Sequence, residues 1–128
     1  MRLADTNVLL GFVMPSGERQ TVALDTLVSG VESADERLVV TEVVLAEAVW
    51  VLRSFYGWER GAIASALIEL LSTPSLVAWD PAVAGAALGL MASDPRLDIA
   101  DCLLAARARV DGDEVVTFDE RLRRTLEG

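Results

Sequence analysis

Short apolar runs alternate along this chain with longer segments whose apolar residues recur at helical spacing. Strand-like runs are expected at Arg2–Ala4, Leu38–Val40, Leu76–Trp79 and Glu114–Thr117, because apolar and β-branched residues fill them and turn residues border them. Neighbouring parallel strands need long crossover connections, which helices supply. The alternation therefore predicts an α/β fold, a central parallel sheet of about four strands flanked by helices.

Caps and turn residues delimit the helices between these strands. The expected helices span Asp5 to about Val13, Glu18 to Val31, Thr41 to Phe55 or Tyr56, Glu59 to Leu71, Pro81 onward, Leu97 to Val110, and Asp119 onward. No internal repeat or linker interrupts this series. Residues 1–128 are therefore predicted to form a single domain.

Composition excludes several classes of active site. The 128 residues include one cysteine, Cys102, and no histidine, which rules out an internal disulfide, serine triads, cysteine–histidine dyads and the usual zinc sites. Apolar residues make up 52% of the chain, but no run reaches the roughly 18 apolar residues of a membrane-spanning helix. The N-terminus begins a strand-like run and not a signal peptide, so we expect a cytoplasmic protein without a membrane segment.

The net charge of −9 argues against a protein that binds nucleic acid through its overall electrostatic field. All eleven basic residues are arginine, a side chain that can bind a phosphate with two donors. Arg121, Arg123 and Arg124 cluster near the C-terminus. They suit a solvated helix end as well as they suit a phosphate contact, and the sequence leaves both interpretations open.

Two aspartates are predicted to follow strands directly. Asp5 comes after the first strand-like run and Asp119 after the last, and ligand sites in open parallel sheets form at the carboxyl ends of strands. Either residue could instead be a simple helix N-cap. Thr6 and Asn7 can hydrogen-bond the nearby backbone and hold the turn that orients Asp5.

Glu47 stands out on its helix. A helical projection places it among Val43, Trp50 and Val51, so we expect a carboxylate on a buried apolar face. An unpaired buried carboxylate costs several kcal/mol, and such a residue usually has a cation, a metal ion or a catalytic role. The alternative is a glutamate at the rim of the apolar stripe that reaches water or an arginine.

Asp98 and Asp101 are spaced i, i+3 at the start of a helix, so both could serve one site. Acidic residues in a first helical turn also complement the helix dipole, and that interpretation is strong for Asp98. Asp101 precedes an apolar run, Cys102 to Ala106, which indicates that its helix is closely packed.

A cluster of these carboxylates would need a cation. If the strands are parallel, Asp5, Asp119 and Asp101 can converge on one edge of the sheet, with Glu47 approaching from its own helix. Two carboxylates about 4 Å apart repel by roughly 4 kcal/mol at an effective dielectric near 20. Oxygen ligands without histidine favour Mg²⁺ or Mn²⁺ over zinc or copper.

These motifs, in this order and over nearly the whole chain, resemble the PIN domains, and within them the VapC-type toxins of toxin–antitoxin pairs. The segments that carry the resemblance are Asp5–Leu10, Leu45–Leu52 around Glu47, Asp98–Asp101 with its alanine-rich helix, and Thr117–Asp119. The resemblance implies a parallel sheet in an α/β/α sandwich, one or two Mg²⁺ or Mn²⁺ ions, and hydrolysis of RNA.

Residue by residue, the resemblance implies a catalytic and metal-binding quartet with helpers. The quartet is Asp5, Glu47, Asp101 and Asp119; Asp98 is a supporting acid; Thr6, Asn7 and Thr117 orient the ligands. The resemblance also implies a cognate antitoxin in the groove and a homodimer formed through the early helices. Trp50, Phe55, Tyr56 and Trp58 could provide an apolar surface for the dimer, although core packing is the commoner role. Many members add a final strand beyond the position of Gly128, so one sheet edge is expected to be shorter.

Three other functions remain open at this stage. An aspartyl phosphatase could use Asp5 as a nucleophile, but Asn7 stands where that chemistry usually has a second aspartate. A PIN nuclease of RNA processing would use the same quartet as a toxin. A non-catalytic PIN domain would bind RNA or a protein partner without cleaving. The RNA target depends on groove shape, which no motif encodes.

Overall fold

The computed structural model describes all residues, 1–128. Three strands and seven helices alternate as expected for an α/β fold. The elements are β1 (Arg2–Leu3), α1 (Thr6–Val13), α2 (Gly17–Ser33), β2 (Leu38–Val40), α3 (Glu42–Ser54), α4 (Arg60–Leu71), β3 (Leu76–Ala78), α5 (Pro81–Ser93), α6 (Ile99–Asp111) and α7 (Glu120–Glu127). No helix is both long and apolar enough to span a membrane.

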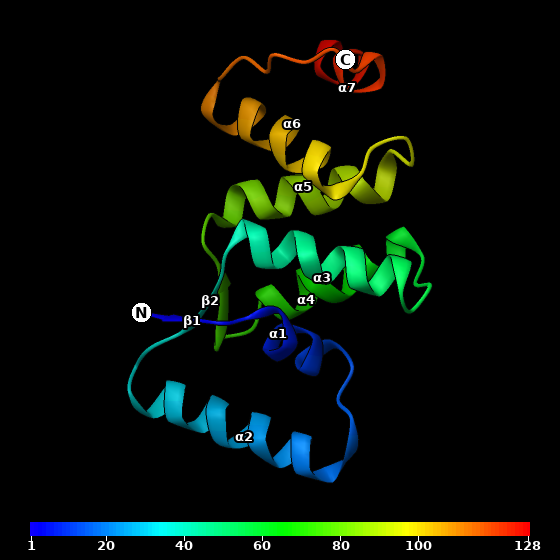
Figure 1. Ribbon diagram of the computed structural model, residues 1–128. Coiled ribbons are helices and arrows are strands. Elements are labelled where there is room, and N and C mark those ends of the chain that lie inside the picture. Colours follow the sequence, from blue (N-terminus) through cyan, green and yellow to red (C-terminus); the bar gives the residue numbers. More distant parts are fainter.

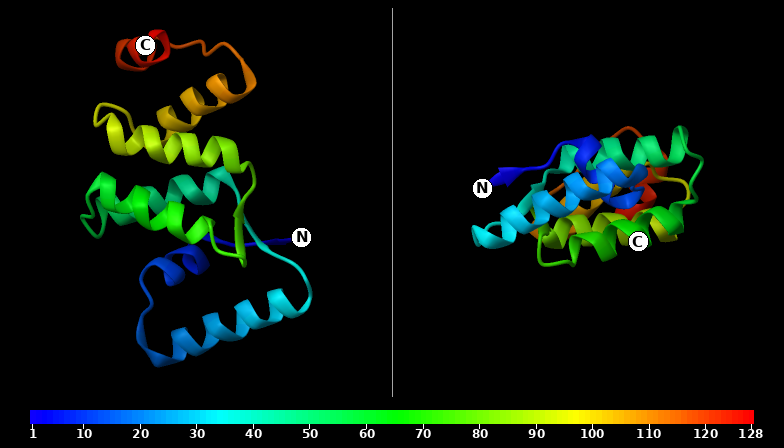
Figure 2. Two further views of the ribbon diagram at one scale, coloured as in Figure 1. Left: turned by 180° about the vertical axis from the view of Figure 1, so that it is seen from behind. Right: turned by 90° about the horizontal axis from the view of Figure 1, so that it is seen from below.

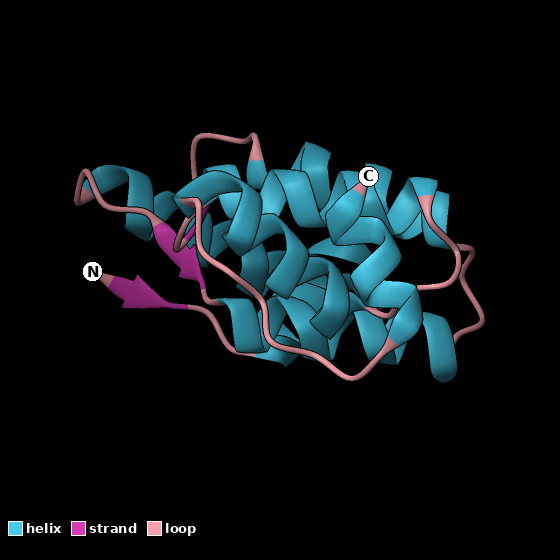
Figure 3. Ribbon diagram, turned by 90° about the horizontal axis from the view of Figure 1, so that it is seen from above, coloured by secondary structure: helices cyan, strands magenta, loops and turns pink.

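The sheet is parallel, in the order β1-β2-β3, and helices flank it. Leu38 pairs with Arg2 on one side and with Leu76 on the other. Figure 3 shows the strands together at one side of the molecule, with helices filling the rest. Because the strands are parallel, Asp5 and Asp80 leave their strands at the same end of the sheet. The predicted parallel α/β architecture is confirmed.

The predicted strand at Glu114–Thr117 is wrong, so the sheet has three strands and not four. Residues 112–118 form a connection between α6 and α7 without regular structure. Val116 is 88% exposed and Phe118 is 97% exposed. A β-branched run becomes a strand only where a sheet edge accepts it. Here α7 lies against α6, and the connection leads to that helix instead of to the sheet.

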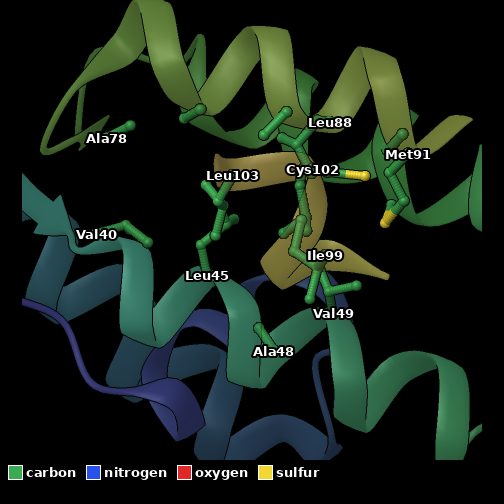
Figure 4. Close-up of a cluster of buried hydrophobic side chains, with 14 of the residues drawn as sticks. Val40, Leu45, Ala48, Val49, Ala78, Leu88, Met91, Ile99, Cys102 and Leu103 are labelled. Atoms are coloured by element: carbon green, nitrogen blue, oxygen red, sulfur yellow. The ribbon is translucent and has the colours of Figure 1, made fainter. Parts of the chain in front are cut away.

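The core lies where α3, α5 and α6 meet (Figure 4). On α3 the buried side chains are Leu45, Ala48, Val49 and Leu52, which have the i, i+3, i+4, i+7 spacing of one helix face. Figure 4 shows Leu45 and Val49 directed toward Ile99 and Leu103 of α6. Helices α5 and α6 pack against each other, and their buried residues include the alanines Ala87, Ala105 and Ala106. Small side chains of this kind let two helices approach closely.

Figures 1 and 2 place α2 and α7 at opposite ends of the molecule, with α3 to α6 between them. Each end helix contributes little to the core, since Val31 is the buried residue of α2 and Leu122 and Thr125 are those of α7. The acids that precede α6 and α7 therefore lie in the half of the molecule away from α2.

Arg107 of α6 joins three helices through ion pairs. Its guanidinium contacts Asp80 Oδ2 at 2.7 Å, Asp111 Oδ2 at 3.1 Å and the Glu42 carboxylate. Asp80 is the N-cap of α5 and Glu42 the first residue of α3. The hydrogen bond from Arg107 holds the pKa of Asp80 below its usual value, helped by the backbone N–H of Val83. This network fixes α3 and α5 against α6.

We expect the stability of Arg107→Met to depend less on pH in the acid range than that of the wild type. The pKa of Asp80 is lowered in the folded state, so its contribution to stability is present above about pH 4 and is lost as the pH falls through the folded pKa. Urea midpoints measured between about pH 5 and pH 2 should therefore fall less steeply in this variant than in the wild type. Arg19→Met, at an exposed arginine of α2, is the control. Parallel pH curves for Arg107→Met and the wild type would contradict the network.

Candidate metal centre

Asp5 follows β1 and caps α1. The amide of Ala4 donates to Val39 O at 3.0 Å, which continues the β1 to β2 pairing up to the residue before Asp5. Asp5 Oδ1 accepts the amide of Val8 at 2.9 Å, and the side chain is exposed. Capping uses one carboxylate oxygen and leaves Oδ2 for another ligand. The N-cap and the ligand interpretations of Asp5 are therefore compatible.

Asp98 and Asp101 lie together at the start of α6. Asp98 is the N-cap, and its Oδ1 accepts the amide of Asp101 at 2.8 Å. Asp101 is half-buried in the first turn. Burial raises the pKa of Asp101, and the charges of Asp98 and Asp119 raise it further. The two charges that raise the pKa of Asp101 thus come from the starts of two different helices, α6 and α7.

Asp119 caps α7. Its Oδ1 accepts the amides of Arg121 at 2.8 Å and Leu122 at 3.3 Å. The hydroxyl of Thr117 accepts the amide of Asp119 at 3.0 Å, and the guanidinium of Arg123 donates to Thr117 O at 3.1 Å. Thr117 therefore holds the turn from which the Asp119 side chain projects, and Arg123 is occupied in that turn.

The expectation that Glu47 lies on a buried face is wrong. Glu47 is exposed, and so are Val43 at 77% and Trp50 at 63% on the same side of α3. The helix has two apolar stripes, and the one containing Leu45 and Leu52 faces the core. Glu47 is therefore a solvent-exposed acid on an uncovered apolar face. Because Glu47 is not buried, burial gives no reason to expect a metal ion there. Its exposed side chain can still contact a ligand.

The structure brings some of the predicted acids together and leaves others apart. A hydrogen bond joins Asp98 and Asp101 at the start of α6, and Asp119 is the N-cap of α7, which packs against α6, whereas no contact joins Asp5 or Glu47 to them. Helix α3, which carries Glu47, packs against both α1 and α6. No three acidic or cysteine side chains lie close enough to hold a metal ion. The group of three fits Mg²⁺ or Mn²⁺ by charge and by its oxygen donors, but ligand distances are not formed.

A shallow groove runs between α3 and α6, the helices that carry Glu47 and Asp101, although neither acid lines it. Ala46, Ala100, Leu103 and Leu104 give it an apolar lining, with Arg107 and its partner Glu42 at one part of its wall. A smaller, more enclosed pocket elsewhere is lined by residues such as Ile68 and Leu88 and contains no ionisable side chain. The groove therefore suits a polar ligand better than the enclosed pocket does.

The sequence reasoning missed Asp80 and its partner Arg107. Asp80 follows β3 as Asp5 follows β1, so the rule applied to Asp5 could have selected it as well. Its charge is neutralised by Arg107, 27 residues away in the chain. Asp94 is likewise bound by Arg96. Asp98, Asp101 and Asp119 differ from these two acids because no arginine pairs with them in the structure.

Comparisons with known proteins agree with these observations. The sequence matches the PIN domain over residues 2–127. It is 32% identical over 127 residues to a VapC ribonuclease of Aquifex aeolicus (strain VF5), covering 97% of this chain and 91% of that protein. No solved structure gives a significant match. By its sequence over nearly its whole length and by its parallel α/β fold, the chain belongs to the PIN domain family.

Proposed function

We propose that this protein is a metal-dependent ribonuclease that hydrolyses phosphodiester bonds in RNA. The observation that carries the proposal is the placement of Asp98, Asp101 and Asp119 at the starts of α6 and α7, two helices in contact, without a cationic partner, in a PIN domain related to a VapC ribonuclease. Like charges gathered in one place favour a bound cation. Oxygen donors alone favour Mg²⁺ or Mn²⁺, as one or two ions.

We assign the metal ligands to the quartet Asp5, Glu47, Asp101 and Asp119, with Asp98 as a supporting acid. Oδ1 of Asp5, Asp98 and Asp119 is held by helix amides, which fixes the direction of each carboxylate. Thr117 holds the Asp119 turn, and Thr6 and Asn7 occupy the first turn of α1 next to Asp5. When bound, the metal would supply an activated water and neutralise charge on the phosphate.

The side chains around the ligands have their own roles in this proposal. Glu47 faces solvent on α3, where it can orient a water molecule or hold a second ion. The groove between α3 and α6 would receive the RNA, and local cations rather than the net charge of −9 would offset the charge of its phosphates. Arg121 and Arg124 remain exposed on α7 and are available for phosphate contacts.

We further propose a toxin role with a cognate antitoxin as partner, on the basis of the similarity to the VapC ribonuclease. A homodimer would use three aromatic side chains of α3 and the turn that follows it, Trp50, Phe55 and Tyr56. These three side chains are 63%, 77% and 51% exposed, and the Phe55 and Tyr56 rings pack edge to face with centroids 4.9 Å apart. Trp58 packs against the core instead, so it is not part of this surface.

The test is RNA cleavage with controlled metal. Protein stripped with EDTA should leave a single-stranded RNA intact, and added Mn²⁺ or Mg²⁺ should restore cleavage. The activity should follow the protein across a size-exclusion peak, which separates it from contaminating nucleases. Cleavage that persists in EDTA would contradict the proposal.

Other outcomes identify the alternative functions. Mn²⁺ binding by calorimetry without any cleavage would indicate a non-catalytic binding domain, and an aspartyl-phosphate trapped on Asp5 would indicate a phosphatase. Slow growth on expression, relieved by the product of a neighbouring short gene, would separate a toxin from an RNA-processing nuclease.

A further inference from the structure

Helix α7 depends on a few contacts for its position. Residues 112–118, which connect it to α6, have no regular structure, and α6 is the helix against which α7 packs. Thr125 is buried, with 8% of its surface exposed. A buried hydroxyl costs stability unless it is hydrogen-bonded. The partners of Thr125 therefore bear on where α7 lies.

The hydroxyl of Thr125 bonds outside its own helix. Oγ1 lies 3.1 Å from Arg121 O, one turn back, and 3.1 Å from Asp94 Oδ2. Thr21 and Thr26 on α2 donate to the preceding turn of their own helix, which is enough to satisfy a helical threonine. The bond to Asp94 is thus an additional tie between α7 and the loop before α6.

Asp94 is a rigid acceptor for this tie. The guanidinium of Arg96 donates to both carboxylate oxygens, at 3.0 and 2.9 Å. Arg60 of α4 donates to the backbone oxygen of Asp94 at 3.1 Å. The pairing with Arg96 holds the pKa of Asp94 far below its usual value, so the acceptor is ionised at neutral pH.

A second tie holds Thr125 from the other side. Arg109 of α6 donates to Thr125 O at 3.1 Å. The hydroxyl and the carbonyl of one residue therefore connect α7 to both the loop before α6 and the body of α6. Asp98 follows Asp94 by four residues, and Asp119 precedes Thr125 by six. These are the two acids whose charges reach Asp101.

We propose that Thr125 is a positioning residue that holds α7, and with it Asp119, against α6, through its hydrogen bond to Asp94. The metal part of this inference rests on the proposed function, because it takes Asp101 and Asp119 as metal ligands. The positional part stands on the hydrogen bonds alone.

Two substitutions separate the hydroxyl from the methyl group of Thr125. Thr125→Val keeps the shape and the apolar packing but removes the hydrogen bond, so we expect Mn²⁺ affinity to fall about tenfold, as for other groups that orient ligands. Thr125→Ser keeps the hydrogen bond and removes a buried methyl, so it should lower the thermal midpoint and leave the affinity unchanged. Thr26→Val, on the distant α2, is the matched control.

The measurements are Mn²⁺ titration calorimetry, thermal unfolding, and hydrogen exchange of the α7 amides without metal. Affinity that follows thermal stability across the three variants, or wild-type affinity in Thr125→Val, would overturn the inference. A wild-type protein that binds no Mn²⁺ would count against the proposed function instead. In that case hydrogen exchange decides the inference: faster exchange over residues 120–127 in Thr125→Val supports the positioning role, and unchanged exchange contradicts it.

Discussion

Replacing Asp101 with Asn is expected to lower metal-dependent RNA cleavage by on the order of a thousandfold and, without metal, to stabilise the fold. The loss of activity follows from removing a proposed ligand at the centre of the acidic group. The gain in stability follows because burial raises the pKa of Asp101, and the charges of Asp98 and Asp119 raise it further. Asn is nearly the same size and carries no charge.

The stabilisation by Asp101→Asn should decrease as the pH falls. Asp101 has a raised pKa in the folded state, so ionising it costs stability, and that cost is fully present above the folded pKa. The cost disappears below the unfolded pKa of about 4. In EDTA, the difference in urea midpoint between Asp101→Asn and the wild type should therefore be positive near pH 7 and vanish as the pH approaches 3.

Added metal should make the urea midpoint of the wild type higher than that of Asp101→Asn, the reverse of their order in EDTA. A ligand that binds only the folded state stabilises it, so saturating Mn²⁺ should raise the urea midpoint of the wild type and leave Asp101→Asn unchanged. Asp5→Asn is the companion variant. It should lose cleavage without the gain in stability, because Asn also caps α1 through the amide of Val8. Undiminished cleavage by Asp101→Asn would overturn the assignment, and lower stability in EDTA would indicate a structural role instead.

The predicted strands are correct only for those segments that lie next to another strand of the sheet. Leu38–Val40 and Leu76–Ala78 are apolar runs that became parallel strands with buried side chains. Val115–Thr117 has the same local character, but it lies in the exposed connection between α6 and α7. Strand preference depends on a sheet edge that accepts the segment. No local pattern carries that information.

The positions of the acids were likewise predictable where they follow from local spacing and not where they depend on distant neighbours. The i, i+3 spacing of Asp98 and Asp101 is a local property, and the structure has both at the start of α6. Glu47 was misplaced because a helical projection gives the faces of α3 but not the face that neighbours cover. The ion pair between Asp80 and Arg107 joins residues 27 apart in the chain, and no local sequence pattern around either residue predicts it. The family itself was predictable, since it rests on the order of motifs over the whole chain, and the comparisons confirm it.

Replacing Arg60 with Met is expected to be the most destabilising of these changes, by roughly 3 kcal/mol. Arg60 is half-buried at the first position of α4, and its guanidinium donates to three backbone oxygens. It bonds Met91 O at 2.9 Å, Asp94 O at 3.1 Å and Leu97 O. These carbonyls lie at the end of α5 and in the loop before α6, and Asp94 O also accepts the amide of Leu97 at 3.4 Å. Met keeps the stem of the side chain and removes all three bonds.

Arg37 provides a matched control with the same number of bonds. Its guanidinium donates to Pro74 O at 3.1 Å, Thr73 O at 3.2 Å and Leu76 O at 3.0 Å, but the side chain is exposed. Water can replace it there, so Arg37→Met should cost about 1 kcal/mol or less. Urea unfolding measures both values. Equal losses would show that burial of the carbonyls does not set the cost.

Arg60 also supports the backbone of Asp94, the residue that accepts the hydroxyl of Thr125. If the tie through Thr125 holds α7, weakening its anchor should loosen the same helix. The rate of hydrogen exchange over residues 120–127 should therefore rise in Arg60→Met and stay unchanged in Arg37→Met. The two variants are compared at denaturant concentrations that give them the same free energy of unfolding. Combining Arg60→Met with Thr125→Val should give less than the sum of the two single effects on α7 exchange, because both act on one chain of hydrogen bonds. Additive effects would mean that α7 is held independently of Arg60.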